Sequence, residues 1–319
     1  MRYIRTALFC LWLPWTVEAR THAAFPSSPI LEPRVQFWEK IFAKYPSHHI
    51  VIHDKDDLSL ILGVIQLRSQ GFENVDSPGA DRLIENTLRL YGETLKGFKE
   101  RGPAMRDEHA LAASIWNACN TPATRQRLLQ GRITLRSQGG LSDTFKEAFR
   151  TSRLYFPQME RIFRDHGLPP ELTRLVFVES MFNLKARSKV GASGLWQLMP
   201  NTARAYIRVN RHVDERNSPL KATRAAARVL QQNYNELRNW PLAITAYNHG
   251  LGGMKRAVVQ TGSNRLSDII EDYRSPSFGF ASSNFYAEFL AALRVHGQHK
   301  ERSLRRNIAE QSAGSDESL

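Results

Sequence analysis

Residues 176–183 read VFVESMFN and place a single carboxylate, Glu179, inside a run of large apolar side chains. Helical spacing puts this carboxylate on the same face as its apolar neighbours Leu172, Leu175, Val176 and Phe182. Phe177 and Met181 make the other flank apolar too, so the pattern predicts a buried helix that starts at Pro169 or Pro170. Burial raises the pKa of a carboxyl group, as a general acid near neutral pH requires. A structural ion pair with Arg174 or Arg187 is the alternative reading of Glu179.

A second segment, SKVGASGLWQLMPNTARAY (188–206), follows the acid closely. Gly191 and Gly194 permit positive φ and a close backbone approach, as a loop that cradles a ligand needs. Gln197 stands between Trp196 and Leu198 and offers both donors and an acceptor to a sugar. Trp196 could stack on a sugar face or could belong to the core, and both readings stay open.

A third segment, WPLAITAYNHGLGGMKRAV (240–258), is an apolar helix that runs into Tyr247 and Asn248 and breaks at Gly250. These two polar groups could hold a carboxyl group or a sugar, whereas His249 beside them is given no catalytic role. Trp240 at its start could stack on a sugar or lie in the core.

The rest of the chain has a helical pattern almost throughout, so the fold class expected is mainly α. HIVIHD (49–54) is the one convincing strand-like run. The organisation expected is a signal peptide at 1–19, a helical N-terminal region at 25–150, a catalytic domain at 151–295 and a flexible tail at 296–319, which lacks core residues.

Charge and composition narrow the function classes. The 319 residues carry a formal charge of +13, which favours an anionic partner such as nucleic acid, lipid or an acidic wall polymer. The sequence has no nucleic-acid-binding motif, and no nucleic-acid partner is expected. Arg2 and Arg5 precede an apolar stretch typical of a secretory signal, so the mature protein is expected to be exported to the periplasm or cell envelope. The spacing of His48, His49 and His53 matches no zinc template, and neither a metal nor a cofactor is predicted.

Taken in order, the three segments resemble the lytic transglycosylase SLT domain. The pattern is carried by Glu179-Ser180, by Ser188 through Pro200, and by Ala246-Tyr247-Asn248-His249-Gly250. The branch most similar is that of membrane-bound lytic murein transglycosylase D, which WPLAITAYNHG and FGFASSNFYAEFLAAL (278–293) also resemble. Met181 departs from the family, which more often has a small polar residue there. The LysM wall-binding repeats of many relatives are not found in this sequence.

The resemblance implies a lysozyme-like α-helical domain that cleaves the β-1,4 bond between N-acetylmuramic acid and N-acetylglucosamine in peptidoglycan and leaves a 1,6-anhydro ring. It implies Glu179 as the catalytic acid. It also implies contacts with the substrate from Ser180, Ser188, Gln197, Met199, Tyr247, Asn248 and Tyr286. Peptidoglycan strands are then the expected partner, and the protein is expected to be a monomer.

Most glycoside hydrolases need two carboxylates. The next acids after Glu179 are Asp214 and Glu215, which fits a mechanism with one carboxylate. Two alternatives stay open, namely a hydrolytic muramidase of the goose-lysozyme type and a non-catalytic scaffold that binds peptidoglycan.

Overall fold

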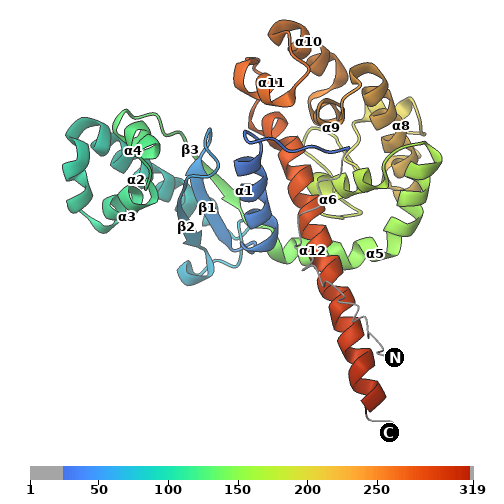
Figure 1. Ribbon diagram of the computed structural model, residues 1–319, viewed down its shortest axis with the longest axis horizontal. Coiled ribbons are helices and arrows are strands. Elements are labelled where there is room, and N and C mark those ends of the chain that lie inside the picture. Colours follow the sequence, from blue (N-terminus) through green and yellow to red (C-terminus); the bar gives the residue numbers. More distant parts are fainter. Residues whose placement is uncertain (1–23, 317–319) are drawn as a thin grey trace, which may run out of the picture.

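The computed structural model describes residues 24–316, with side chains to residue 308. Figure 1 shows a larger helical body on the right and a smaller unit on the left that contains a β-sheet. We call residues 46–141 the N-terminal unit and the rest of the described chain the helical body. The predicted signal peptide lies outside the described residues.

The N-terminal unit contains three strands and three α-helices, namely β1 (His49–Asp54), β2 (Ile61–Gln66), α2 (Ala80–Arg101), α3 (Ala110–Ala118), α4 (Pro122–Leu129) and β3 (Leu135–Gly139). Short 3-10 turns add Arg68–Gln70 and Gly102–Asp107. The strand order is β2-β1-β3 with both pairs antiparallel, so Ile50 lies opposite Ile65 on one side and Gly139 on the other. The predicted strand at 49–54 is confirmed, whereas β2 and β3 were not predicted within the N-terminal region expected to be helical.

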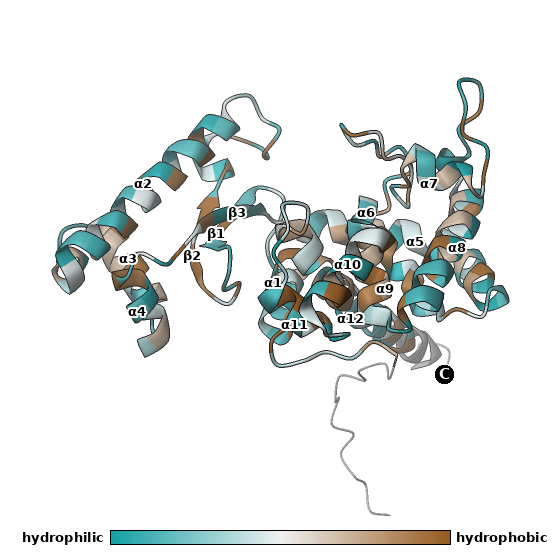
Figure 2. Ribbon diagram, turned by 90° about the horizontal axis from the view of Figure 1, so that it is seen from above, coloured by the Kyte–Doolittle hydropathy of each residue, from teal (hydrophilic) through white to brown (hydrophobic). Residues whose placement is uncertain are grey.

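The helical body consists of α1 (Glu32–Ala43), α5 (Ser142–Asp165), α6 (Leu175–Ser180), α7 (Pro200–Arg204), α8 (Pro219–Leu237), α9 (Trp240–His249), α10 (Leu251–Thr261), α11 (Leu266–Asp272) and α12 (Phe280–Asp316). Two 3-10 segments, Pro170–Arg174 and Glu215–Asn217, join these helices. α9 lies at the centre of the body and is mostly hydrophobic (Figure 2), with Leu242 to Ala246 all buried. The mainly α fold is confirmed.

Two apolar cores hold these parts together. The smaller core belongs to the N-terminal unit and is centred on Phe98 and Ile115. The larger core fills the helical body and includes Phe25 and the buried face of α1. α1 packs on α12, and α5 begins at Ser142 and runs through residue 150. The predicted N-terminal region, residues 25–150, is therefore divided between the two cores. The expected boundary at 150/151 therefore falls inside a helix.

α12 continues past residue 295 to Asp316, although residues 296–319 were predicted to be a flexible tail. Its C-terminal half projects away from the body (Figure 1). The expectation that this segment lacks core residues overlooked two histidines: His296 is only 9% exposed, and the His299 ring lies 5.1 Å from that of Phe149. These contacts extend the buried face of α12 by one turn. Beyond that turn, residues with high helix propensity continue the helix. Within the described residues, no helix is long and apolar enough to cross a membrane.

Candidate active site

The candidate acid, Glu179, lies in the last turn of α6. Pro170 starts the preceding 3-10 turn, as its fixed φ favours, and α6 begins at Leu175. The helix ends abruptly because Met181 and Phe182 adopt left-handed backbone angles, with φ of 46° and 59°. The apolar residues predicted on the face of Glu179 are all buried, with Phe182, at 4%, the most exposed.

The carboxyl group of Glu179 is partly buried and has no hydrogen-bond partner within the described residues. Loss of solvation, with a smaller contribution from the charge of Glu288, raises its pKa to about 8. A carboxyl group in this environment keeps its proton at neutral pH and can donate it.

The alternative reading, a structural ion pair, does not describe this site. Arg174 instead forms an ion pair with Glu160 and stacks 4.4 Å over the Phe156 ring. Arg187 is exposed, and its charge contributes to the lowered pKa of Asp214. No ion pair joins Glu179 to a basic side chain of residues 24–308.

The glycine-rich loop, residues 186–199, wraps against the end of α6. The hydroxyl of Ser180 donates to the carbonyl oxygen of Leu195 at 2.8 Å and fastens the loop to the acid helix. Gly194 has a φ of 75°, and a Cβ atom there would lie 2.0 Å from the carbonyl oxygen of Arg216. The predicted close backbone approach therefore exists, but it is an approach to another part of the chain.

Arg216 closes the loop from behind. Its guanidinium group donates to the carbonyl oxygens of Gly191 at 2.7 Å and Leu198 at 2.9 Å, and it forms a two-pronged pair with Asp214. Because Arg216 is only 7% exposed, these charge-assisted bonds lie in a poorly solvated place and are strong. The loop is thus a rigid part of the site.

Two predicted binding residues, Ser188 and Gln197, shape the loop. The Ser188 hydroxyl accepts from the amide of Ala192 at 2.8 Å. Gln197 has a φ of 43°, and its amide group donates to the carbonyl oxygens of Ala186 and Gly194. Contact of either residue with a substrate stays a prediction.

Met199, by contrast, is 42% exposed at the end of the loop, where a ligand could reach it. Trp196 is fully buried, donates to Thr223 and stacks on Phe163 with ring centroids 5.5 Å apart. The core reading of Trp196 is therefore correct.

The third segment meets the other two at the end of α9. The Tyr247 hydroxyl donates to the carbonyl oxygen of Trp196 at 2.8 Å. Burial, together with the nearby charge of Glu179, raises the pKa of Tyr247 well above its ordinary value. Asn248 is exposed, and its Oδ1 accepts from the hydroxyl of Ser282 on α12 at 2.9 Å. The three predicted segments thus meet near the carboxyl group of Glu179, whose pKa is raised.

Comparison with known proteins agrees with this arrangement. Residues 160–270 match the family model described as "Transglycosylase SLT domain". This part of the chain is an SLT domain. The membrane-bound lytic murein transglycosylase D of Escherichia coli (strain K12) is 35% identical over 98 residues, which cover 30% of this chain and 22% of that protein.

Two other proteins are similar to parts of this chain. A protein of Alteromonas sp. (strain M-1) named for tributyltin chloride resistance is 37% identical over 94 residues, covering 29% of this chain and 45% of that one. The structure of the 70 kDa soluble lytic transglycosylase from Escherichia coli aligns with a TM-score of 0.39 and 17% identity, covering 72% of this chain and 37% of that chain. The matched stretches thus span less than half the length of the curated relatives.

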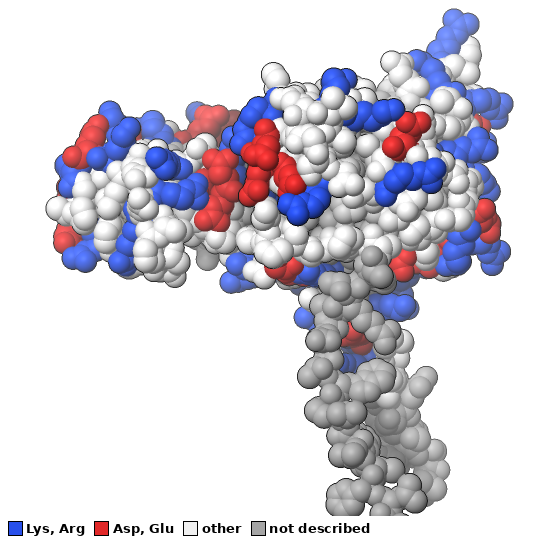
Figure 3. All heavy atoms as spheres, turned by 45° about the horizontal axis from the view of Figure 1, so that its top comes forward, with Lys and Arg blue, Asp and Glu red and all other residues white. Residues whose placement is uncertain are grey.

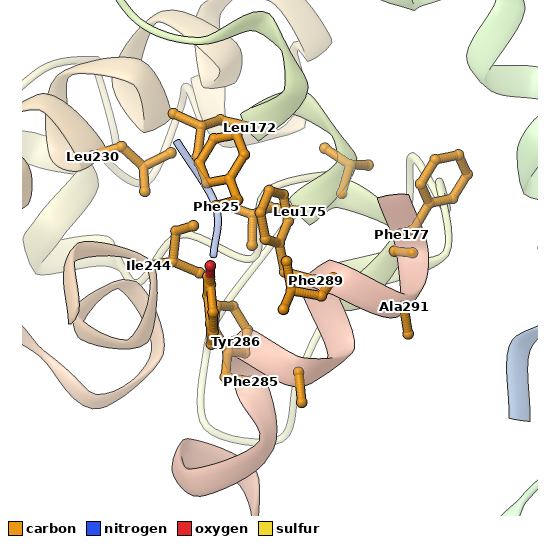
Figure 4. Packing of buried hydrophobic residues seen from close by; sticks show 14 of the residues in the cluster. Phe25, Leu172, Leu175, Phe177, Leu230, Ile244, Phe285, Tyr286, Phe289 and Ala291 are labelled. Atoms are coloured by element: carbon orange, nitrogen blue, oxygen red, sulfur yellow. The ribbon is translucent and has the colours of Figure 1, made fainter. Parts of the chain in front are cut away.

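Tyr286 lies on α12, beyond the matched SLT segment, and does not occupy the surface position predicted for it. It is 1% exposed, and its hydroxyl donates to the carbonyl oxygen of Pro26 at 2.9 Å. Figure 4 shows it packed beside Phe25 and Phe289 in the core of the helical body. Because residues 24–31 return across this end of α12, Tyr286 cannot touch a substrate in this structure.

Trp240 also lies away from the acid, at the start of α9. Its ring stacks on Tyr234 with centroids 4.2 Å apart, and Phe25 meets it edge-on. Its place in an aromatic cluster of the SLT domain favours the core reading.

Sequence reasoning missed Glu288, a second carboxyl group near the acid of the SLT domain. Burial raises its pKa to about 8, and the positive charge of Arg136 opposes the shift. A signal was present in the sequence: like Glu179, Glu288 is the lone acid in an apolar run, FYAEFLAAL (285–293). Sequence distance does not reveal this second acid, because it is helix packing that brings α12 against α6.

The described residues hold no group of three or more His, Cys, Asp or Glu side chains arranged to bind a metal ion. The ring of His53, one of the three histidines considered for zinc, is buried 4.6 Å from that of Phe37.

Proposed function

We propose that this protein is a peptidoglycan lytic transglycosylase that cleaves the β-1,4 bond between N-acetylmuramic acid and N-acetylglucosamine. The observation that carries the proposal is the raised pKa of Glu179, whose carboxyl group has lost solvation beside Tyr247 in an SLT domain. The name of the similar lytic murein transglycosylase D supports the same class of substrate.

In the first step, Glu179 donates its proton to the glycosidic oxygen as the bond breaks. A carboxyl group with a pKa of about 8 is mostly protonated at neutral pH, so the acid is ready when the substrate binds. Positive charge develops on the muramic acid ring, and the 2-acetamido group of the substrate itself can stabilise it.

In the second step, the ionised Glu179 accepts the proton of the 6-hydroxyl of the same sugar, and that oxygen attacks the anomeric carbon. The nucleophile belongs to the substrate, so little translational entropy is lost. The product is a 1,6-anhydromuramoyl end, and Glu179 regains its proton for the next cycle.

The substrate contacts we propose divide into two kinds. Met199, at the end of the glycine-rich loop, and Asn248, at the end of α9, are exposed and are suited to direct contact. Ser180, Ser188 and Gln197 hold the glycine-rich loop in shape through main-chain bonds, and Tyr247 fixes that loop to α9. Lys and Arg side chains spread over both parts of the molecule (Figure 3) suit a polymer that carries lactyl and peptide carboxylates.

A hydrolytic muramidase is the second candidate, and Glu288 is the observation that favours it. Hydrolysis with two carboxylates uses one as the acid and the other as a base or nucleophile. Burial, however, raises the pKa of Glu288 as well, so at neutral pH this group is a poor base. We therefore favour the mechanism with one working carboxyl group.

We further propose that the protein acts in the cell envelope as a monomer. The secretory pattern at residues 1–19 and the name of the relative described as membrane-bound support this location.

The activity is tested by incubating the purified chain with peptidoglycan sacculi and measuring the soluble muropeptides released. We expect release by the wild type and a loss of at least about a hundredfold in Glu179→Gln. Glu301→Gln, the same substitution at an exposed site on α12, is the matched control and should retain full activity. Equal release by wild type and Glu179→Gln would contradict the proposal, and binding of sacculi without release would favour a scaffold.

A further inference from the structure

Glu288 occupies an unusual place on α12. Its neighbours Phe285, Tyr286, Ala287, Phe289 and Leu290 are all at most 5% exposed, whereas Glu288 is partly buried. α12 packs against α6, the helix that carries Glu179. An ionisable side chain in such a position costs stability unless it is paired or neutral, and within residues 24–308 no ion pair holds it. Its retention in a packed helix therefore calls for a function.

The charge of Glu288 acts on Glu179. After the loss of solvation, it is the second cause of the raised pKa of Glu179. Two carboxyl groups that share a poorly solvated space resist ionising together, so each favours the protonated form of the other.

Arg136 brings the N-terminal unit into this arrangement. It lies on β3, and its guanidinium group stacks 4.0 Å above the ring of Phe280, at the start of α12. Phe280, Asn284 and Glu288 follow one another at i, i+4 and i+8 along the same side of that helix. The positive charge of Arg136 opposes the rise in the pKa of Glu288.

Three other cations on or near α12 are already engaged by side chains. Arg34 of α1 donates to Oδ1 of Asn284 at 3.0 Å. Arg294 is held by Glu32, and Arg174 by Glu160.

On the remaining sides, α9 contributes Tyr247 and His249. Burial keeps the Tyr247 hydroxyl protonated and lowers the pKa of His249, so both groups are neutral near neutral pH. Arg136 is exposed and forms no ion pair within the described residues, which leaves its charge available to Glu288.

We propose that Glu288 is a positioning residue that acts through Glu179, keeping the proton on the catalytic acid, and that Arg136 of the N-terminal sheet supports this effect by favouring the ionised form of Glu288. The inference rests on the proposed function, in which Glu179 must start each cycle protonated. It gives the N-terminal unit a part in the chemistry: a cation from the sheet sets how much negative charge Glu288 presents to the acid.

Carboxyl titration by ¹³C NMR tests the coupling without any activity measurement. In protein labelled at the glutamate carboxyl carbons, the Glu179 signal is the one lost in Glu179→Gln, and the Glu288 signal the one lost in Glu288→Gln. We expect Glu288→Gln to lower the pKa of Glu179 by more than about half a unit, whereas Glu301→Gln leaves it unchanged. An unchanged Glu179 pKa in Glu288→Gln overturns the proposal.

Arg136→Gln, a substitution at an exposed position on β3, supplies a second reading should Glu288→Gln fail to fold. Measured in the Glu179→Gln background, where Glu288 titrates alone, its pKa should rise when Arg136 is neutralised. If the pKa of Glu288 does not rise in this variant, the proposed role of Arg136 is wrong.

The pH profile of sacculus digestion separates positioning from a purely structural role. In Glu288→Gln we expect the alkaline limb to move to lower pH while the rate at about pH 5 changes little, and Glu288→Asp should restore most of the shift. A uniform loss at every pH with an unchanged Glu179 pKa would overturn the proposal and indicate a direct catalytic role for Glu288. If the wild type releases no muropeptides at any pH, the proposed function fails, but the NMR result on the coupling still stands.

Discussion

The hydroxyl of Ser180 donates a hydrogen bond of 2.8 Å to the carbonyl oxygen of Leu195 and so joins the acid helix to the glycine-rich loop. The same loop is held from behind by Arg216 and from α9 by Tyr247. Glu179 therefore sits where three separate segments are fixed to one another. Its neighbours are already in place before a substrate arrives, as electrostatic catalysis requires.

The backbone contact at Gly194 can be tested with a matched pair of glycines. Gly194→Ala should destabilise the protein by more than about 2 kcal/mol, because a Cβ atom there meets the Arg216 carbonyl oxygen at 2.0 Å and φ is positive. Gly191→Ala shares the positive φ but meets nothing within 4 Å, so it should cost only about 1 kcal/mol. Urea denaturation measures both, and equal losses would contradict the clash.

The left-handed turn after α6 predicts an inverted order of two truncations. Met181→Gly and Met181→Ala both remove the side chain, but only alanine keeps the strain of a φ of 46°. The glycine variant should be more stable by roughly 1 kcal/mol, the reverse of the usual order in helices. The comparison needs only the two denaturation midpoints. An alanine variant at least as stable as the glycine one would show that this turn carries no strain.

Ser282 orients Asn248, so its removal should lower turnover. Ser282→Ala deletes the bond to Oδ1 of Asn248 and frees the amide to rotate, and we expect a loss of several-fold to about tenfold in kcat. The adjacent Ser283, whose hydroxyl donates to the Phe280 carbonyl oxygen, is the control: Ser283→Ala should stay near the wild-type rate. Equal rates for the two variants would mean that Asn248 needs no such support.

Glu179 should also make the folded state less stable as pH rises. Its pKa is about 8 in the fold against 4.5 when unfolded, so between these values the folded state binds the additional proton. The free energy of unfolding must therefore fall from about pH 4.5 to about pH 8 and then level off. Glu179→Gln removes this fall, and its stability advantage should grow across the window to the order of 1 kcal/mol or more. Glu301→Gln should show no such trend.

Parts of the structure were accessible from sequence because local patterns decide them. β1 was predicted from HIVIHD, and the buried acid from its apolar face. β3, LRSQG, has no strand pattern of its own and is a strand because it pairs with β1. Gly63 interrupts β2, where a Cβ atom would lie 2.1 Å from the Tyr91 hydroxyl, so only tertiary packing explains that residue.

The site was also predicted only in part, because local motifs decide some of its residues and tertiary packing decides the others. Motif order predicted Glu179, Tyr247 and Asn248 near one another, and the structure bears this out for Glu179 and Tyr247. Tyr286 was misplaced because its surroundings include Phe25 and Pro26, at the other end of the chain. Pro26, which accepts the hydrogen bond of the Tyr286 hydroxyl, is 260 positions away. Glu288 was missed because its partner lies on a different helix, and distance along the sequence does not report that packing.

The most direct test of the central claim is the mass of the muropeptides released from purified sacculi. If Glu179 works alone and the 6-hydroxyl of the sugar attacks, the products should end in 1,6-anhydromuramic acid, about 18 Da lighter than reducing ends because no water is added. Products with reducing ends from the first minutes of reaction would contradict the account and identify a hydrolase.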